Sequence, residues 1–392
     1  MSAQDAPEVA TALVARAASP SPSGRAIPNR GRGSRDPGRR PVRWSHQECR
    51  PRAEGYIDRP CGLRLACRHA NPSGFPGPAR VAAPPARPEL MERGPVVLDG
   101  AMGTELDARG VDTAHELWSA RALTEAPETV TAIHADYLDA GARVICANSY
   151  QATLPALART GLAEEEARAV IAASARLALD ARDRHVGPRT RDAVLVAGSI
   201  GPYGAYLADG SEYTGAYTTG ADDFEEVHLP RLGILAEEGL RLFAIETQPH
   251  LGETRWLVER LRRIAIDAEC WVSFQVRPDG AQLADGTPLT EAAAWADTED
   301  AIVAVGVNCV APAVVDRALP MLRAVTGKPL VAYPNSGDAY DPITKTWCRA
   351  RGRGRFADAV PAWLDAGVRL IGGCCGTAPM DTAALHSLVA RW

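Results

Sequence analysis

The sequence predicts an α/β protein that folds as a (β/α)8 TIM-type barrel and carries a disordered N-terminal extension. Two observations predict the barrel: eight apolar runs alternate with helical stretches from residue 95 onward, and polar residues end nearly every run. The third concerns residues 1–92, which are rich in Pro, Gly, Ser and Arg and show no apolar periodicity. A chain of that composition buries too little apolar surface to offset its ordering entropy.

The folded domain is therefore expected to span residues 93–392. Residues 1–90 hold 15 arginines against 7 acidic residues, whereas the rest of the chain holds 28 basic and 41 acidic residues. Met91 stands directly before the first ordered pattern. We hypothesise that Met91 is the physiological start and that residues 1–90 are upstream sequence.

The eight strand candidates are continuous and rich in Val and Ile, which is typical of parallel strands buried on both faces. In chain order they are 96–100, 143–149, 193–201, 242–248, 270–276, 302–309, 329–335 and 369–375. Helix candidates such as 163–185 and 252–266 lie between them. Eight strand–helix units in about 300 residues match a (β/α)8 barrel. A doubly wound open sheet is the alternative, but the first turn, "LDGAMGTEL", lacks the G-x-G-x-x-G phosphate turn.

Composition excludes several classes of partner. The acidic balance of the domain argues against nucleic acid, and no apolar run approaches the roughly 20 residues that span a bilayer. Nine cysteines, an odd number at irregular spacing, indicate a reducing and hence cytoplasmic setting. Small molecules are the expected partners, and the protein is expected to be a monomer or a homo-oligomer.

Polar side chains stand where the strands end, and the carboxyl ends of barrel strands form the catalytic face. They are Asp99, Asn148, Ser149, Ser199, Glu246, Asn308, Cys309, Asn335, Ser336, Cys374 and Cys375. Because Cys309, Cys374 and Cys375 all stand at strand ends, their three thiols are expected at one mouth. Adjacent cysteines rarely form a disulfide with each other, so the thiols are expected to be free to bind a metal. Three thiolates suit one Zn²⁺ ion with an open fourth position. The alternative is that Cys309 is a small core residue and the Cys pair is incidental.

A zinc ion with three thiolates is a weak Lewis acid that suits binding a fourth, substrate thiolate. Metal coordination deprotonates a thiol at neutral pH, so the pattern favours alkyl transfer to a substrate thiol. Cys146, inside the second strand, is interpreted as a small buried apolar residue, and Trp118 as a packing residue. A zinc store without enzymatic activity is the remaining alternative.

Seven segments resemble the homocysteine S-methyltransferase family in order: "LDGAMGTELDARG", "ANSYQAT", "AGSIGPYGAYLADGSEYTGAY", "ETQP", "GVNC", "YPNSG" and "IGGCCGT". The resemblance covers residues 95–391 and is closest to members that use S-methylmethionine or S-adenosylmethionine. It implies methyl transfer to homocysteine, forming methionine, with one zinc per chain bound by Cys309, Cys374 and Cys375. Another thiol or a selenol is the alternative acceptor. Betaine is disfavoured as donor because Ala101 stands where betaine-using members carry glycine.

The resemblance also implies the substrate-binding residues. Asp99 and Glu246 would hold the ammonium group of homocysteine by charge-assisted hydrogen bonds, with Ser149 and Asn308 nearby. The sulfonium donor needs aromatic faces and carboxylates. The expected donor-binding residues follow the third strand and are Tyr203, Tyr206, Glu212 and Tyr213.

Overall fold

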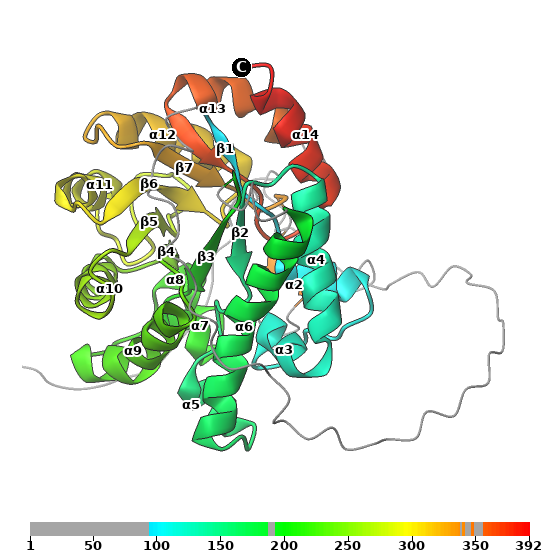
Figure 1. Ribbon diagram of the computed structural model, residues 1–392. Coiled ribbons are helices and arrows are strands. Elements are labelled where there is room, and N and C mark those ends of the chain that lie inside the picture. Colours follow the sequence, from blue (N-terminus) through cyan, green and yellow to red (C-terminus); the bar gives the residue numbers. More distant parts are fainter. Residues whose placement is uncertain (1–93, 187–192, 338, 342–345, 349–355) are drawn as a thin grey trace, which may run out of the picture. The chain divides into compact units, whose positions relative to one another are not determined.

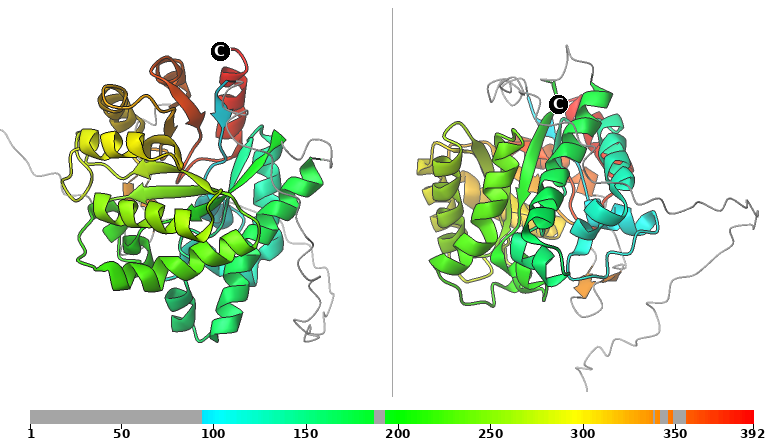
Figure 2. Two further views of the ribbon diagram at one scale, coloured as in Figure 1. Left: turned by 60° about the vertical axis from the view of Figure 1, so that its left-hand side comes forward. Right: turned by 60° about the horizontal axis from the view of Figure 1, so that its bottom comes forward.

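The structure is a computed structural model that describes residues 94–186, 193–337, 339–341, 346–348 and 356–392. The expected extension, residues 1–92, and the start-site hypothesis at Met91 lie outside these residues and stay predictions. Figure 1 shows the strands at the centre of the domain, with the helices arranged around them. Two further views in Figure 2 show the same arrangement from other directions.

Eight parallel strands form the barrel. They are β1 (Val96–Val97), β2 (Val144–Ala147), β3 (Leu195–Ile200), β4 (Leu242–Gln248), β5 (Glu269–Phe274), β6 (Ile302–Asn308), β7 (Leu330–Tyr333) and β10 (Val368–Ile371). The sheet order is β1-β10-β7-β6-β5-β4-β3-β2. A parallel bridge between Leu98 and Val144 joins the two ends of this order, and the N–H of Arg143 donates to Val97 O at 2.8 Å. The predicted barrel is confirmed, and the open-sheet alternative is wrong.

Each strand lies inside its predicted run or begins one residue before it, but the predicted runs extend up to four residues past the strand ends. A short antiparallel pair, β8 (Ala339–Asp341) with β9 (Thr346–Cys348), was not predicted. The 3-10 turns span Trp118–Arg121 and Phe356–Asp358. The α-helices are α2 (Met102–Ala108), α3 (Ala122–Glu125), α4 (Pro127–Asp139), α5 (Leu154–Arg159), α6 (Glu164–His185), α7 (Tyr203–Leu207), α8 (Ser211–Thr214), α9 (Ala221–Glu237), α10 (Leu251–Ile264), α11 (Leu289–Thr298), α12 (Pro312–Arg323), α13 (Val360–Asp365) and α14 (Pro379–Val389).

Helix α6 shows why the predicted helices form. Its first turn contains Glu164, Glu165 and Glu166, and its last turn contains basic side chains. This charge order complements the helix dipole, and Glu166 also accepts a hydrogen bond from the N–H of Ala163 at 2.9 Å. Predicted helices 163–185 and 252–266 are confirmed as α6 and α10. Every helix of the described residues is too short or too polar to cross a membrane.

The core has two layers, because alternate strand residues face the barrel interior or the helices. Trp271 on β5 fills the interior and is fully buried, and its indole N–H donates to the Tyr333 hydroxyl at 3.0 Å. The fully buried members of the same interior cluster on β3, β4 and β6 are alanines. Gly306 on β6 is required by close packing, since a Cβ there would lie 1.7 Å from Val331 O. The filled interior leaves the carboxyl ends of the strands to form the site.

Candidate active site

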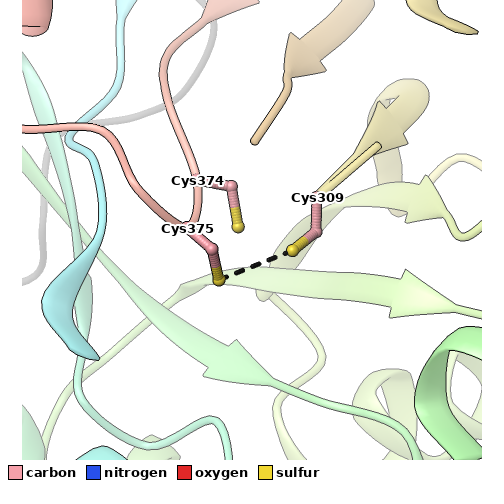
Figure 3. Close-up of side chains that lie close together, drawn as sticks. All are labelled: Cys309, Cys374 and Cys375. Atoms are coloured by element: carbon pink, nitrogen blue, oxygen red, sulfur yellow. Dashed lines mark hydrogen bonds between the residues drawn. The ribbon is translucent and has the colours of Figure 1, made fainter. Parts of the chain in front are cut away.

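The three predicted thiols meet at the carboxyl end of the barrel. Cys309 follows β6, and Cys374 and Cys375 follow β10 (Figure 3). Their sulfur atoms all lie within 4.8 Å of one another, and the Sγ atoms of Cys309 and Cys375 are 3.6 Å apart. Thiolates about 2.3 Å from a tetrahedral zinc lie about 3.8 Å apart. The cluster therefore fits a zinc ion held by three sulfur ligands.

The segment that follows β7 fixes the backbone of all three cysteines. Four hydrogen bonds do this: Cys309 N–H to Tyr333 O (3.0 Å), Cys374 N–H to Pro334 O (2.8 Å), Ser336 N–H to Cys375 O (2.9 Å) and Asn335 Nδ2 to Cys309 O (3.0 Å). Strand β7 lies between β6 and β10 in the sheet. It is thus the strand that can bridge both sources of sulfur, and the "YPNS" sequence at its end, residues 333–336, performs that role.

The thiols of the cluster shift one another's pKa in opposite directions. Hydrogen bonds from Cys374 and Cys375 hold the pKa of the Cys309 thiol well below its usual range. The hydrogen bond to Cys309 raises the pKa of Cys374 in turn. A cluster that concentrates negative charge on sulfur in this way favours a soft cation.

Two buried carboxyl groups line the same cavity as the thiols. Asp99 lies beyond β1, and its Oδ2 accepts a hydrogen bond from the N–H of Cys146 at 2.7 Å. Glu246 on β4 accepts a hydrogen bond from the Ser199 hydroxyl. Burial raises the pKa of Asp99 to about 8 and that of Glu246 to about 7. Two carboxyl groups that lose solvation in this way favour a cationic ligand.

Besides Tyr333, three aromatic side chains line this cavity, which measures about 100 Å³. They are Trp118, Tyr150 and Tyr213. The Trp118 and Tyr150 rings meet edge to face at 6.3 Å, and the Tyr213 hydroxyl lies 3.8 Å from the Sγ of Cys309. Trp118 has a left-handed φ of 43°. The interpretation of Trp118 as a packing residue missed this position, because no strand ends there.

The expected donor-binding residues divide into two groups. Tyr213 is on the cavity wall, whereas Tyr203, Tyr206 and Glu212 are not among the described residues that line the cavity. The Tyr206 ring instead packs against Tyr203 at 5.3 Å and lies under the Arg159 guanidinium at 4.4 Å. Tyr203, Tyr206 and Glu212 thus lie off the described cavity wall, and their role in donor binding stays a prediction.

Two predicted substrate-binding residues lie behind the wall. The Ser149 hydroxyl is fully buried and donates to Ser199 O at 2.8 Å. Asn308 is also fully buried, and both ends of its amide bond to Thr247. Their polar groups bond to the protein itself, and contact of either residue with substrate stays a prediction. Cys146 was interpreted from the sequence as a small buried apolar residue, but it lines the cavity.

Comparison with known proteins gives the family. The homocysteine S-methyltransferase family model matches residues 96–389. The homocysteine S-methyltransferase of Escherichia coli (strain K12) is 45% identical over 305 residues, covering 77% of this chain and 98% of that protein. A selenocysteine Se-methyltransferase of Brassica oleracea var. italica is 37% identical over 312 residues, covering 76% of this chain and 90% of that protein.

A solved structure agrees with this match. The metallated form of the homocysteine methyltransferase MmuM from Escherichia coli superimposes with a TM-score of 0.68 at 43% identity, covering 75% of this chain and 96% of that one. The family match, residues 96–389, includes the barrel strands and the segments that carry the cysteine cluster. The resemblance seen in the sequence is confirmed, and the chain belongs to the homocysteine S-methyltransferase family.

Proposed function

We propose that this enzyme transfers a methyl group from a sulfonium compound to the thiolate of L-homocysteine, forming methionine, with one zinc ion bound by Cys309, Cys374 and Cys375. The observation that carries the proposal is the shared cavity. Three thiols within 4.8 Å of one another and two buried carboxyl groups line the same space. An amino acid that carries a thiol matches both features.

The cysteines hold the metal, and their spacing supports this part of the proposal. When bound, zinc supplies a position at which a fourth, substrate thiol loses its proton at neutral pH. The segment after β7 keeps the three sulfur atoms at their spacing through four hydrogen bonds. The chain's own contribution is thus an ordered set of ligands.

Asp99 and Glu246 hold the ammonium group of homocysteine. Each is more than nine-tenths buried, so a charge-assisted hydrogen bond to an ammonium is stronger there than in water. Because Asp99 and Glu246 line the same cavity as the thiols, they orient the substrate by binding its nitrogen while its sulfur meets the thiol cluster. Binding the nitrogen in this way fixes the direction of the attacking sulfur.

Trp118, Tyr150 and Tyr213 surround the sulfonium donor. Aromatic faces attract cations through the ring quadrupole, and they also exclude water from the cavity. The homocysteine sulfur attacks the methyl carbon and forms the new S–C bond. The old S–C bond breaks, and its electron pair stays on the departing neutral thioether. Both S-methylmethionine and S-adenosylmethionine satisfy this balance.

The cluster also requires a reducing compartment such as the cytoplasm. The Sγ atoms of Cys309 and Cys375, 3.6 Å apart, need only a small movement to form a disulfide, whose bond is about 2.05 Å long. Oxidation would remove two ligands from the site.

The test measures methionine formation by the purified full chain. Homocysteine is supplied with S-methylmethionine, S-adenosylmethionine or betaine, before and after zinc removal and zinc return. Zinc-dependent turnover with a sulfonium is the expected result, and Cys375→Ser should lose both turnover and stoichiometric zinc. Parallel assays use selenocysteine as acceptor, because a relative is named for that reaction.

Each other outcome identifies a different function. Turnover only with selenocysteine would replace the acceptor and keep the site. Turnover with betaine alone would overturn the sulfonium donor. Stoichiometric zinc without turnover on any pair would favour a zinc store, and a protein that binds no zinc would overturn the proposal.

A further inference from the structure

The side chain of Asn308 joins two strand ends that are not neighbours in the sheet. Its Oδ1 accepts a hydrogen bond from the N–H of Thr247, and its Nδ2 donates to Thr247 Oγ1, both at 2.8 Å. Asn308 ends β6 and Thr247 lies near the end of β4, while β5 lies between these strands. This pair of bonds, here called the 308–247 clasp, therefore spans the end of β5.

Each end of the clasp is next to a residue of the proposed site. Glu246 precedes Thr247, and Cys309 follows Asn308. The clasp also reaches the cavity wall, because Thr247 and Tyr150 share a side-chain hydrogen bond. The clasp is buried, since Asn308 is fully inaccessible and Thr247 is 2% exposed. Burial therefore shields both bonds from bulk water, and Thr247 itself lines the cavity.

The backbone is strained at Thr247 and at Cys309, the residue that follows Asn308. Thr247 has a φ of 57° and Cys309 a φ of 49°. Left-handed backbone is unfavourable for a non-glycine residue, and β-branched residues such as Thr adopt it least readily. Such strain persists only where surrounding bonds hold it. The bond from the Thr247 N–H to Asn308 holds the first position, and Asn335 and Tyr333 hold the second.

We infer that Asn308 is a positioning residue that couples the carboxylate end of the cavity to its sulfur end through the 308–247 clasp. This rests on the proposed function, since it takes Glu246 and Cys309 as the groups to be positioned. Without the clasp, Thr247 relaxes toward right-handed backbone and turns the neighbouring Glu246 carboxyl away from the cavity. Asn308 directly precedes Cys309, so loss of its side chain also removes the bonds that fix the backbone next to Cys309. One substitution at Asn308 therefore weakens two kinds of binding.

The test compares the full-chain enzyme with Asn308→Ala. The zinc dissociation constant is measured by chelator competition with the metal alone, and the homocysteine dissociation constant by calorimetry at saturating zinc. We expect zinc to bind 10–100-fold more weakly, the range seen when groups behind metal ligands are removed. We expect homocysteine to bind about tenfold more weakly, equal to the loss of about 1.4 kcal/mol.

Asn335→Ala is the matched control. The Asn335 side chain donates a hydrogen bond to the backbone oxygen of Cys309 at 3.0 Å. Among the described residues, no hydrogen bond joins the Asn335 side chain to the Glu246 side of the cavity. We expect this variant to weaken zinc binding and to leave homocysteine binding at saturating zinc within twofold. If Asn335→Ala weakens both zinc and homocysteine binding as much as Asn308→Ala does, the special role of the clasp is overturned.

Rescue separates strain from packing. Glycine adopts a φ of 57° at little cost, so adding Thr247→Gly to Asn308→Ala should recover at least threefold of the lost homocysteine affinity. No recovery would overturn the strain argument. If Asn308→Ala does not fold, Thr247→Val removes one of the two bonds and keeps the side-chain volume. It should then weaken both affinities about threefold, and unchanged affinities would refute the clasp.

Two further outcomes are distinguishable. A lower melting temperature in Asn308→Ala with both affinities within twofold of the wild type would make Asn308 a purely structural residue. A wild-type protein that binds neither zinc nor homocysteine would refute the proposed function instead.

Discussion

The Glu253 carboxylate lies 2.8 Å from Nε2 of His228, and both side chains are fully buried. Glu253 also accepts hydrogen bonds from Tyr203 N–H at 2.6 Å and from the Tyr217 hydroxyl at 2.7 Å. Arg231 bonds to the other nitrogen of His228 at 2.8 Å. This buried network ties both ends of segment 203–217, which carries Tyr213, to helices α9 and α10.

Glu253→Ala should destabilise the protein by about 3–5 kcal/mol, because removal of one partner leaves the buried Arg231 charge uncompensated. Urea unfolding measures this loss. Glu259→Gln is the control on the same helix, since the exposed Glu259–Arg263 pair contributes below about 1 kcal/mol. Equal effects of the two substitutions would contradict the network's importance.

Tyr213 and Tyr206 should respond differently to substitution. Tyr213 lines the cavity beside Cys309, whereas Tyr206 packs against Arg159 outside it. We expect Tyr213→Ala to raise the donor KM at least tenfold, because it removes an aromatic face. Tyr206→Ala should leave the donor KM within twofold. Initial rates at saturating homocysteine measure both values, and the reverse order would move the donor site toward Tyr206.

Ammonium binding should strengthen as pH rises from 6 to 8. Burial raises the pKa of Glu246 to about 7 and that of Asp99 to about 8, so both carry protons at pH 6 in the free protein. A bound ammonium favours the ionised carboxylates, and binding therefore releases protons. The effect fades above pH 8, where the carboxyl groups are already ionised.

L-Homoserine is the probe for this titration, because it has no thiol to lose a proton. Calorimetry in buffers of different ionisation enthalpy counts the protons released. Glu246→Gln should release fewer protons than the wild type at pH 6.5. An identical count would mean that Glu246 does not titrate on binding.

His134 should make the protein sensitive to acid. It is fully buried on α4, neither ring nitrogen has a hydrogen-bond partner among the described residues, and burial lowers its pKa to about 4. The unfolded chain binds a proton near the usual pKa of about 6.5. The stability that neutral His134 permits is therefore present above pH 6.5 and is lost as pH falls toward 4.

The loss should approach about 1.4 kcal/mol for each pH unit inside that window. His134→Leu should flatten the dependence when urea unfolding is compared at pH 7.5 and pH 5. His185→Gln, at the partly exposed end of α6, is the control and should follow the wild type. A wild-type slope in His134→Leu would assign the acid sensitivity to other groups.

Removal of the metal should expose three thiols and lower the melting temperature. A ligand at a thousand times its dissociation constant stabilises by about 4 kcal/mol, and chelation removes that amount. Alkylation followed by mass spectrometry should then label Cys309, Cys374 and Cys375. Cys270 is the internal control, because it is fully buried on β5 and burial raises its pKa to about 12. Labelling of Cys270 at the same rate would indicate unfolding instead.

The sequence predicted the parts of the site that lie on the strands. The carboxyl ends of barrel strands meet at one mouth, so the order of strands was enough to bring Cys309 to Cys374 and Cys375. The same rule brought Asp99 and Glu246 to the cavity. These residues need only the strand register, which the apolar runs determine.

Residues on loops could not be predicted in this way. Tyr206 and Tyr213 lie on two short helices, α7 and α8, separated by a left-handed turn at Gly210, and no periodicity says which of them faces the cavity. Trp118 reaches the wall through a left-handed backbone position. Asn308 ends a strand as predicted, but the pattern of strand ends does not identify Thr247 as the partner of its side chain.

The pairing of β1 with β10 has a consequence for synthesis of the chain. Asp99 follows the first strand of the barrel and Cys375 follows the last, and these two strands are partners in the sheet. A ribosome must therefore release nearly the whole domain before the carboxylate and the full set of sulfur ligands can meet. A nascent chain that ends before Val368 has one of the three ligands and an unpaired first strand. Under the proposed function, zinc loading therefore follows translation, because prematurely terminated chains of this kind lack Cys374 and Cys375.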